Sequence, residues 1–135
     1  MTEIESIKNG QRLYHIIQAG ERIFRSIDGI TKDDFYANED KQGNVVRCLE
    51  IIGEATNHLS EEILTAHEDI PWHAIVGMRN NLIHGYNEVN YEFVWATVQN
   101  DIRPLIDRAK QILLGIKLPD DFQCPPLPYG AREIT

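Results

Sequence analysis

The segment MRNNLIHGY, residues 78–86, contains an arginine, a histidine and a tyrosine whose spacing could support chemistry. Arg79 presents a permanently charged guanidinium with a fork of N–H donors that suits a phosphate. His84 can accept and donate a proton near neutral pH. Cleavage of RNA without a metal ion needs these two functions, because a base must deprotonate the ribose 2′-hydroxyl and a cation must stabilise the charge that develops at phosphorus. The segment is therefore a candidate site for phosphodiester cleavage.

The spacing of the two side chains limits how they can meet. At 3.6 residues per turn, Arg79 and His84 lie roughly 140° apart on an ideal helix. The side chains of Arg79 and His84 therefore cannot point in the same direction from one regular helix. Either the helix distorts at its Gly85 end, or a second subunit completes the site.

The same segment has an alternative interpretation without chemistry. Asn80 and Asn81 together lower the stability of a helix by about 1 kcal/mol relative to alanine. In this alternative the asparagines form hydrogen bonds within a bundle, and His84 and Tyr86 close the end of a helix.

The elements that must position these residues follow from the spacing of apolar side chains, which recur at i, i+3, i+4 and i+7. This pattern predicts long helices over residues 11–27, 43–60, about 70–85 and 90–113, and short ones at 31–35 and after Ser60. Thr31, with an acidic residue three positions later, and Asn90 are expected to cap the helices that they begin. Pro104 should kink the last long helix. Residues 1–9 are expected to form a loose leader. No segment alternates as a β-strand does.

The fold class expected from this pattern is all-α, a four- to five-helix up-and-down bundle. The chain has 135 residues, which fits one domain, expected over residues 1–117. Four of the six prolines lie between residues 119 and 128, so residues 118–135 are expected to form an irregular, extended, Pro-rich tail.

Composition restricts the class of protein further. The chain is 42% hydrophobic and 25% charged, and it carries two cysteines, too few for a disulfide framework. No apolar run approaches the roughly 20 residues of a membrane span, and no signal peptide is visible, so a cytoplasmic location is expected. The net charge of −8 predicts weak non-specific affinity for RNA, although a cleft needs only a few local cations.

The pattern Arg79-Asn80-x3-His84-x-Tyr86 resembles the R-x4-H-x-Y motif of HepT-like ribonucleases in the HEPN superfamily. The resemblance extends in order over about residues 10–110 and includes the segments LYHIIQAGERI, RCLEIIGEAT, IPWHAIVGMRNNLIHGY and VWATVQNDIRPLI. It implies a homodimeric helical bundle whose motif lines a shared cleft. It also implies a metal-independent endoribonuclease toxin of a type VII toxin–antitoxin system, encoded beside a nucleotidyltransferase antitoxin and acting without a cofactor.

The resemblance also implies roles for individual residues. Arg79 would hold the scissile phosphate, His84 would be the general acid and base, and Asn80 matches the polar residue that follows the motif arginine. Tyr86 would receive AMP from the antitoxin, which blocks the site with a bulky anion. Glu54, in the recurrent GEA segment, is a secondary candidate that lines the dimer groove or orients an arginine.

Two rival functions remain open at this point. In the first, the chain is a non-catalytic helical dimer that serves as partner and AMP acceptor for a nucleotidyltransferase. In the second, it is a structural dimerisation module.

Possible metal ligands and two glycines within the predicted helices also bear on function and packing. Glu50, Glu54 and His58 follow one another at intervals of four residues like a metal stripe, but di-iron bundles use paired Glu-x-x-His motifs that are absent here. The mid-helix glycines Gly53 and Gly77 predict close helix–helix approach.

Overall fold

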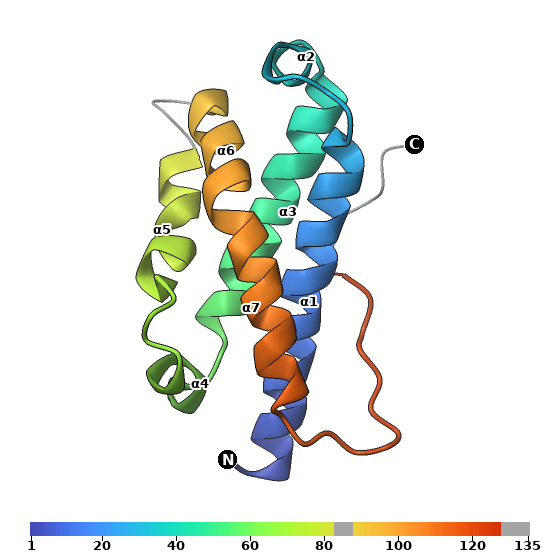
Figure 1. The fold of residues 1–135 in the computed structure, drawn as a ribbon, viewed down its shortest axis with the longest axis vertical. Helices are drawn as coiled ribbons and strands as arrows, with labels where there is room; N and C mark the ends of the chain where they lie inside the picture. The colour runs from blue at the N-terminus through green and yellow to red at the C-terminus, as the bar shows by residue number, and fades with distance from the viewer. Residues whose placement is uncertain (83–87, 128–135) are drawn as a thin grey trace.

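The computed structural model describes residues 1–82 and 88–127, which are helical throughout their regular elements and contain no β-strand. The elements are α1 (Glu3–Ile27), α2 (Lys32–Tyr36), α3 (Glu39–Asn57), α4 (Glu61–Ala66), α5 (Trp72–Leu82), α6 (Tyr91–Thr97), the π-helical turn η1 (Val98–Ile102) and α7 (Arg103–Leu114). Helices α1, α3 and α5 and the continuous rod α6–η1–α7 form the bundle, while α2 and α4 lie at its two ends (Figure 1). The prediction of an all-α up-and-down bundle is confirmed.

Side-chain caps determine where several helices begin. Thr2 accepts a hydrogen bond from the backbone N–H of Glu5 at 3.1 Å, and the Glu5 carboxylate accepts one from the N–H of Thr2 at 3.4 Å. This reciprocal pair is a capping box, which satisfies N–H groups that the first turn leaves without partners. The expectation of a loose leader over residues 1–9 was therefore wrong, because Thr2 and Glu5 start α1 at Glu3. Thr31 caps α2 in the same way, as its sequence predicted.

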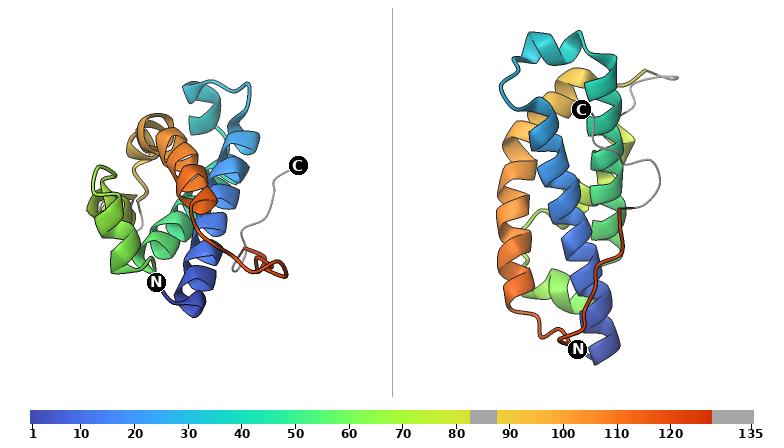
Figure 2. Two further views of the ribbon diagram at one scale, coloured as in Figure 1. Left: turned by 60° about the horizontal axis from the view of Figure 1, so that its bottom comes forward. Right: turned by 90° about the vertical axis from the view of Figure 1, so that its right-hand side faces the viewer.

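Helix α1 forms the centre of the core, packed against α3 on one side and α7 on the other (Figure 2). Its residues Leu13, Ile16 and Ile23 are fully buried. Gly20 permits the contact with α7, since a Cβ built there would lie 2.5 Å from Cδ1 of Ile106. Close packing of this kind is what apolar residues at helical spacing produce once the helices meet.

The predicted disturbance at Pro104 takes the form of a π-helical turn. The turn spans Val98–Ile102, and Pro104 follows as one of the first residues of α7. Proline has no N–H to donate to the carbonyl four residues back, so a regular α-helix cannot continue through it unchanged. A single widened turn accommodates the missing bond and keeps α6 and α7 in one rod.

The two mid-helix glycines behave differently. A Cβ on Gly53 would lie 3.5 Å from the carbonyl oxygen of Ile75, so Gly53 lets α3 approach the backbone of α5 as predicted. A Cβ on Gly77 would meet nothing within 4 Å. The expectation of close approach at Gly77 was wrong for contacts within the described part of this chain.

Residues 118–127, called the strap below, are irregular as predicted but lie along α1 (Figure 2). Leu118 and Phe122 pack over Gly10, where a Cβ would come within 2.9 Å of Leu118. Phe122 stacks on Tyr14 with ring centroids 5.6 Å apart. Within residues 1–82 and 88–127, no helix has the length and apolarity that a membrane span requires.

Candidate functional site

The R-x4-H-x-Y motif begins within α5. Arg79 and Asn80 belong to its last two turns, and the side chain of Asn80 is exposed. The side chain of Arg79 lies outside what the structure describes, and His84 and Tyr86 fall in the undescribed segment 83–87. The structure therefore places the helix that leads into the motif and the helix that follows it.

These two helices are joined directly across the motif. The backbone N–H of Asn90 donates a hydrogen bond of 2.8 Å to the carbonyl oxygen of Leu82. The side chain of Asn90 then caps α6 by accepting a hydrogen bond from the N–H of Phe93 at 3.0 Å, as the sequence predicted. Leu82 is 1% exposed, so this junction is anchored in the core. This hydrogen bond thus fixes the end of α5 against the start of α6.

Helix α5 is held firmly at its other end as well. The indole N–H of Trp72 donates a hydrogen bond of 3.0 Å to the carbonyl oxygen of His67. Trp72 itself is buried. Ile75, Met78 and Leu82 are buried on one face, at the spacing of a core-facing helix. Two of these residues, Ile75 and Met78, also line a groove beside α5.

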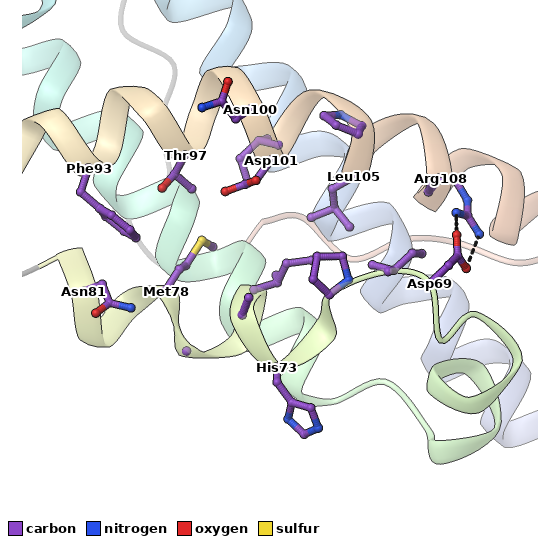
Figure 3. Close-up of a pocket in the computed structure, with 17 residues that line it drawn as sticks. Asp69, His73, Met78, Asn81, Phe93, Thr97, Asn100, Asp101, Leu105 and Arg108 are labelled. Carbon is purple, nitrogen blue, oxygen red and sulfur yellow. Dashed lines mark hydrogen bonds and ion pairs between the residues drawn. The ribbon is translucent and has the colours of Figure 1, made fainter.

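The groove lies between α5 and the rod formed by α6, η1 and α7, and its volume is about 590 Å³ (Figure 3). Its lining is largely apolar and includes Met78, Phe93 and Leu105. Asn81 and Phe93 stand at one end of it, near the motif, and Asp69 and Arg108 stand at the other (Figure 3). Gly77 also lines this groove, so the open space beside it is groove space.

Asn81 was not assigned a role from the sequence, yet its side chain lines the groove. Asn80, which was assigned one, does not line it. The sequence did contain a signal, because Asn81 follows Gly77 by four residues and Ala74 by seven, and both of these line the groove too. Residues at this spacing share one helix face.

The η1 turn supplies polar groups to the facing wall. Thr97, Asn100 and Asp101 all line the groove, on the stretch of rod that carries the π-helical turn. A π-helical turn shifts the side chains that follow it around the helix axis, which is why such turns are frequent at functional sites. Pro104, three residues after Asp101, is the only sequence signal for this local arrangement.

An ion pair closes the end of the groove that is distant from the motif. The guanidinium of Arg108 donates to both carboxylate oxygens of Asp69, with Nη2 3.2 Å from Oδ1 (Figure 3). These hydrogen bonds hold the pKa of Asp69 below its ordinary value and raise that of Arg108. The pair links the start of α5 to α7 over 39 residues of sequence, so no local pattern could have indicated it.

We expect Asp69→Asn to remove a pH-dependent contribution to stability. The folded-state pKa of Asp69 is lowered, so the contribution is present above the ordinary pKa and is lost as pH falls through the lowered value. The effect is small because both side chains are partly exposed. The unfolding temperatures of wild type and Asp69→Asn, with Asp107→Asn as the control, should differ at neutral pH and converge as the pH falls through the lowered pKa of Asp69. A difference that persists at low pH would contradict this account.

Glu54 lies outside the groove, and so do Glu50 and His58, the other two possible metal ligands on and beside α3. Glu54 is exposed on α3 and does not line the groove described above. Its Oε1 lies 3.3 Å from Nε2 of His58, one turn later, which is an ion pair when the imidazole is protonated. Among the described residues, no three His, Cys, Asp or Glu side chains are grouped to hold a metal ion.

Comparison with known proteins gives consistent results. The family described as "Ribonuclease HepT-like" matches residues 16–112. The chain is 41% identical over 101 residues to a protein of Caldanaerobacter subterraneus subsp. tengcongensis named "Putative RNase TTE0752", covering 75% of this chain and 90% of that protein. It is 38% identical over 100 residues to "Probable ribonuclease HepT" of Thermococcus cleftensis, covering 74% of this chain and 91% of that protein. No solved structure gives a significant match.

Proposed function

The chain belongs to the HepT-like family of ribonucleases, which makes it an endoribonuclease, and from this premise we propose that it cleaves RNA without a metal ion. The observation that carries the proposal is that the family match spans the whole of Arg79-Asn80-x3-His84-x-Tyr86. In the proposed reaction His84 removes the proton of a ribose 2′-hydroxyl. The hydroxyl oxygen attacks the adjacent phosphorus, the bond to the 5′-oxygen breaks, and an imidazolium protonates the leaving oxygen.

Arg79 serves in this proposal as the cation that holds the scissile phosphate. The guanidinium stabilises the extra negative charge on phosphorus, a type of interaction that contributes strongly where water is excluded. Asn80 and Glu54 are supporting residues, Asn80 by its position beside Arg79 and Glu54 by its place in the GEA segment. The products would carry a 2′,3′-cyclic phosphate and a 5′-hydroxyl.

We expect purified wild-type protein to cleave RNA at an unchanged rate in the presence of excess EDTA, because neither proposed catalytic group requires a metal ion. Incubation with total RNA, followed by analysis of the product ends, tests this. A metal-dependent nuclease in the same buffer shows that the chelator works. Loss of cleavage with EDTA, restored by a divalent cation, would contradict the mechanism. Absence of cleavage under all conditions would favour the non-catalytic AMP acceptor.

A homodimer is the proposed form of the enzyme, with the groove beside α5 as the contact surface. Two features of the described residues support this. The groove is mostly apolar, as the centres of homodimer interfaces are. Gly77 leaves room for a second helix to approach, since a Cβ there meets nothing within 4 Å. A two-fold axis at this surface would bring two copies of the motif together. Arg79 of one subunit could then meet His84 of the other, although the two residues lie roughly 140° apart on a single ideal helix.

The proposed partner is a nucleotidyltransferase antitoxin of a type VII system, which would transfer AMP to the hydroxyl of Tyr86. The added phosphate gives Arg79 a competing anion, and the adenosine occupies space beside His84. We expect Tyr86→Phe to remain toxic when the nucleotidyltransferase is co-expressed, whereas wild type is neutralised. Growth of the two strains, with Tyr91→Phe as the control, measures this. Equal neutralisation of wild type and Tyr86→Phe would contradict the assignment.

A further inference from the structure

Apart from the groove, a smaller pocket lies at the end of the bundle where the motif begins. It is formed between α2 and the start of α6, and its volume is about 420 Å³, within the range of pockets that hold small organic ligands. Helix α2, the start of α6 and the end of α5 stand at the same end of the bundle (Figure 1). The residues that line the pocket are Tyr36, Glu88, Val89, Asn90, Tyr91 and Glu92.

A backbone hydrogen bond joins this pocket to the helix that bears Arg79. The N–H of Asn90, a lining residue, donates to the carbonyl oxygen of Leu82 at 2.8 Å. Leu82 follows Arg79 by three residues on α5, which is a rise of about 4.5 Å along an α-helix. The pocket therefore lies next to the stretch of α5 from which Arg79 is proposed to hold the scissile phosphate.

The aromatic wall of the pocket is supported from the core. Tyr36 lines the pocket from α2, and the ring of Phe35, which is 1% exposed, has its centroid 6.2 Å from that of Tyr36. The Tyr36 hydroxyl is buried and has no hydrogen-bond partner among the described residues, which costs free energy unless another group bonds to it. Nζ of Lys32 lies 5.9 Å from the ring centroid of Tyr36 and places a cation beside this wall. A supported aromatic ring of this kind is a surface on which single-stranded bases stack.

The polar wall of the pocket carries two carboxylates. Glu88 and Glu92 line the pocket and are exposed, and within residues 1–82 and 88–127 neither side chain forms a hydrogen bond or an ion pair. A carboxylate only accepts hydrogen bonds, so it recognises groups that donate them. Carboxylates repel phosphate, so this wall is unsuited to the backbone of an RNA strand. It is suited to the edge of a base that presents N–H groups.

We propose that this pocket binds a guanine base of the RNA substrate, next to the phosphate that is cleaved. The proposal rests on the proposed ribonuclease function and adds a sequence preference to it. Guanine is the RNA base whose Watson–Crick edge carries two adjacent donors, N1–H and the N2 amino group, and Glu88 and Glu92 supply the acceptors for them. Tyr36 and Val89 provide the surface against which the base packs. The two glutamates select the base and take no part in breaking the bond.

The direct test maps where the wild-type protein cuts. A single-stranded RNA with equal proportions of the four bases and no stable structure is partly digested in EDTA, and the product ends are sequenced. We expect guanine at one fixed position beside the cut, preferred by about tenfold or more, the discrimination that a bidentate contact between a side chain and a base provides. Replacing guanine by inosine, which lacks only the N2 amino group, should remove most of this preference.

An isosteric double variant tests the two glutamates. Glu88→Gln combined with Glu92→Gln should abolish the preference for guanine, while cleavage beside the other bases continues at the wild-type rate or faster because repulsion of phosphate is reduced. Glu61→Gln combined with Glu68→Gln removes the same charge from exposed positions on and after α4, at the opposite end of the bundle, and should retain the preference (Figure 1). Thermal unfolding of each variant shows that it is folded.

Binding without cleavage separates this proposal from the ribonuclease mechanism. Fluorescence anisotropy with His84→Ala measures the affinity for short labelled RNAs that differ only in one base, which is guanine, inosine or adenine. We expect the guanine RNA to bind about tenfold more tightly than the other two. Equal affinity for the three RNAs, no binding of any of them, or an unchanged preference in the variant that also lacks Glu88 and Glu92 would overturn the proposal. Selective binding by a protein that cleaves nothing would refute the mechanism alone.

Discussion

His84→Ala is expected to lower the rate of RNA cleavage by about 10²–10⁴-fold, the usual contribution of a positioned general acid and base. Arg79→Ala should lower it by about 10²–10³-fold, because the transition-state charge at phosphorus loses its cation. Initial rates on a fluorogenic RNA in EDTA measure both effects. His67→Ala, at the histidine that follows α4, is the control for the loss of an imidazole, and Arg12→Ala is the control for the loss of a cation.

The two variants also report on stability and mechanism separately. If both keep their cleavage rates, the chain is not a ribonuclease of the proposed type, and the structural dimerisation module becomes the better description. If they lose cleavage but also lose their thermal unfolding transition, more conservative replacements are required, and Arg79→Lys and His84→Gln serve that purpose. A folded, inactive Arg79→Lys would support bidentate contact with phosphate, since lysine keeps the charge but not the fork.

Mixing the two inactive variants tests whether the site is shared between subunits. In a mixed dimer, one site lacks both groups while the other has Arg79 from one chain and His84 from its partner. Random mixing should therefore restore about one quarter of the wild-type activity if each site combines residues across the two-fold axis. Restoration requires dissociation and reassociation of the subunits, which mild denaturant followed by dilution achieves. No recovery after verified exchange would place both groups of each site in one chain.

Phe35→Ala should produce the largest loss of stability among single substitutions in the described core. Phe35 is 1% exposed and lies in α2, between the ends of α1 and α3. Its ring centroid lies 5.3 Å from that of Trp95 and 6.3 Å from that of Tyr91, both on α6. Truncation to alanine leaves a cavity and removes these contacts, at a cost of about 3–5 kcal/mol.

Urea denaturation measures this loss as a change in the free energy of unfolding. Phe24→Ala is the matched control, because Phe24 is only half-buried and the guanidinium of Arg103 lies over its ring, 3.9 Å from the centroid. Its loss should be smaller than that of Phe35→Ala. Equal losses would mean that the aromatic contacts between α2 and α6 do not contribute as the packing indicates. Because Phe35 packs against α6, which starts beside the motif, Phe35→Ala should also loosen the contact between the end of α5 and the start of α6.

Much of the fold could be predicted because local rules determine it. Apolar spacing located the long helices, Thr31 and Asn90 gave correct helix starts, and Pro104 indicated a disturbance of the rod, which the structure shows as a π-helical turn ending two residues before the proline. These features depend on residues within one or two turns of each other. The error at residues 1–9 arose from overlooking the Thr2 and Glu5 capping box, a signal that was local and present.

The sequence by itself determined the helices and the motif that identifies the family, whereas only the tertiary structure decided which side chains share a surface. Asn81 rather than Asn80 lines the groove, Gly53 but not Gly77 meets a neighbouring helix, and Asp69 pairs with Arg108 across the bundle. The strap, which composition indicated only as an irregular tail, forms one wall of a pocket on α1. Helix propensity and caps act over a few residues, but these contacts join residues tens of positions apart, and their identity depends on how the rigid helices rotate and pack against one another.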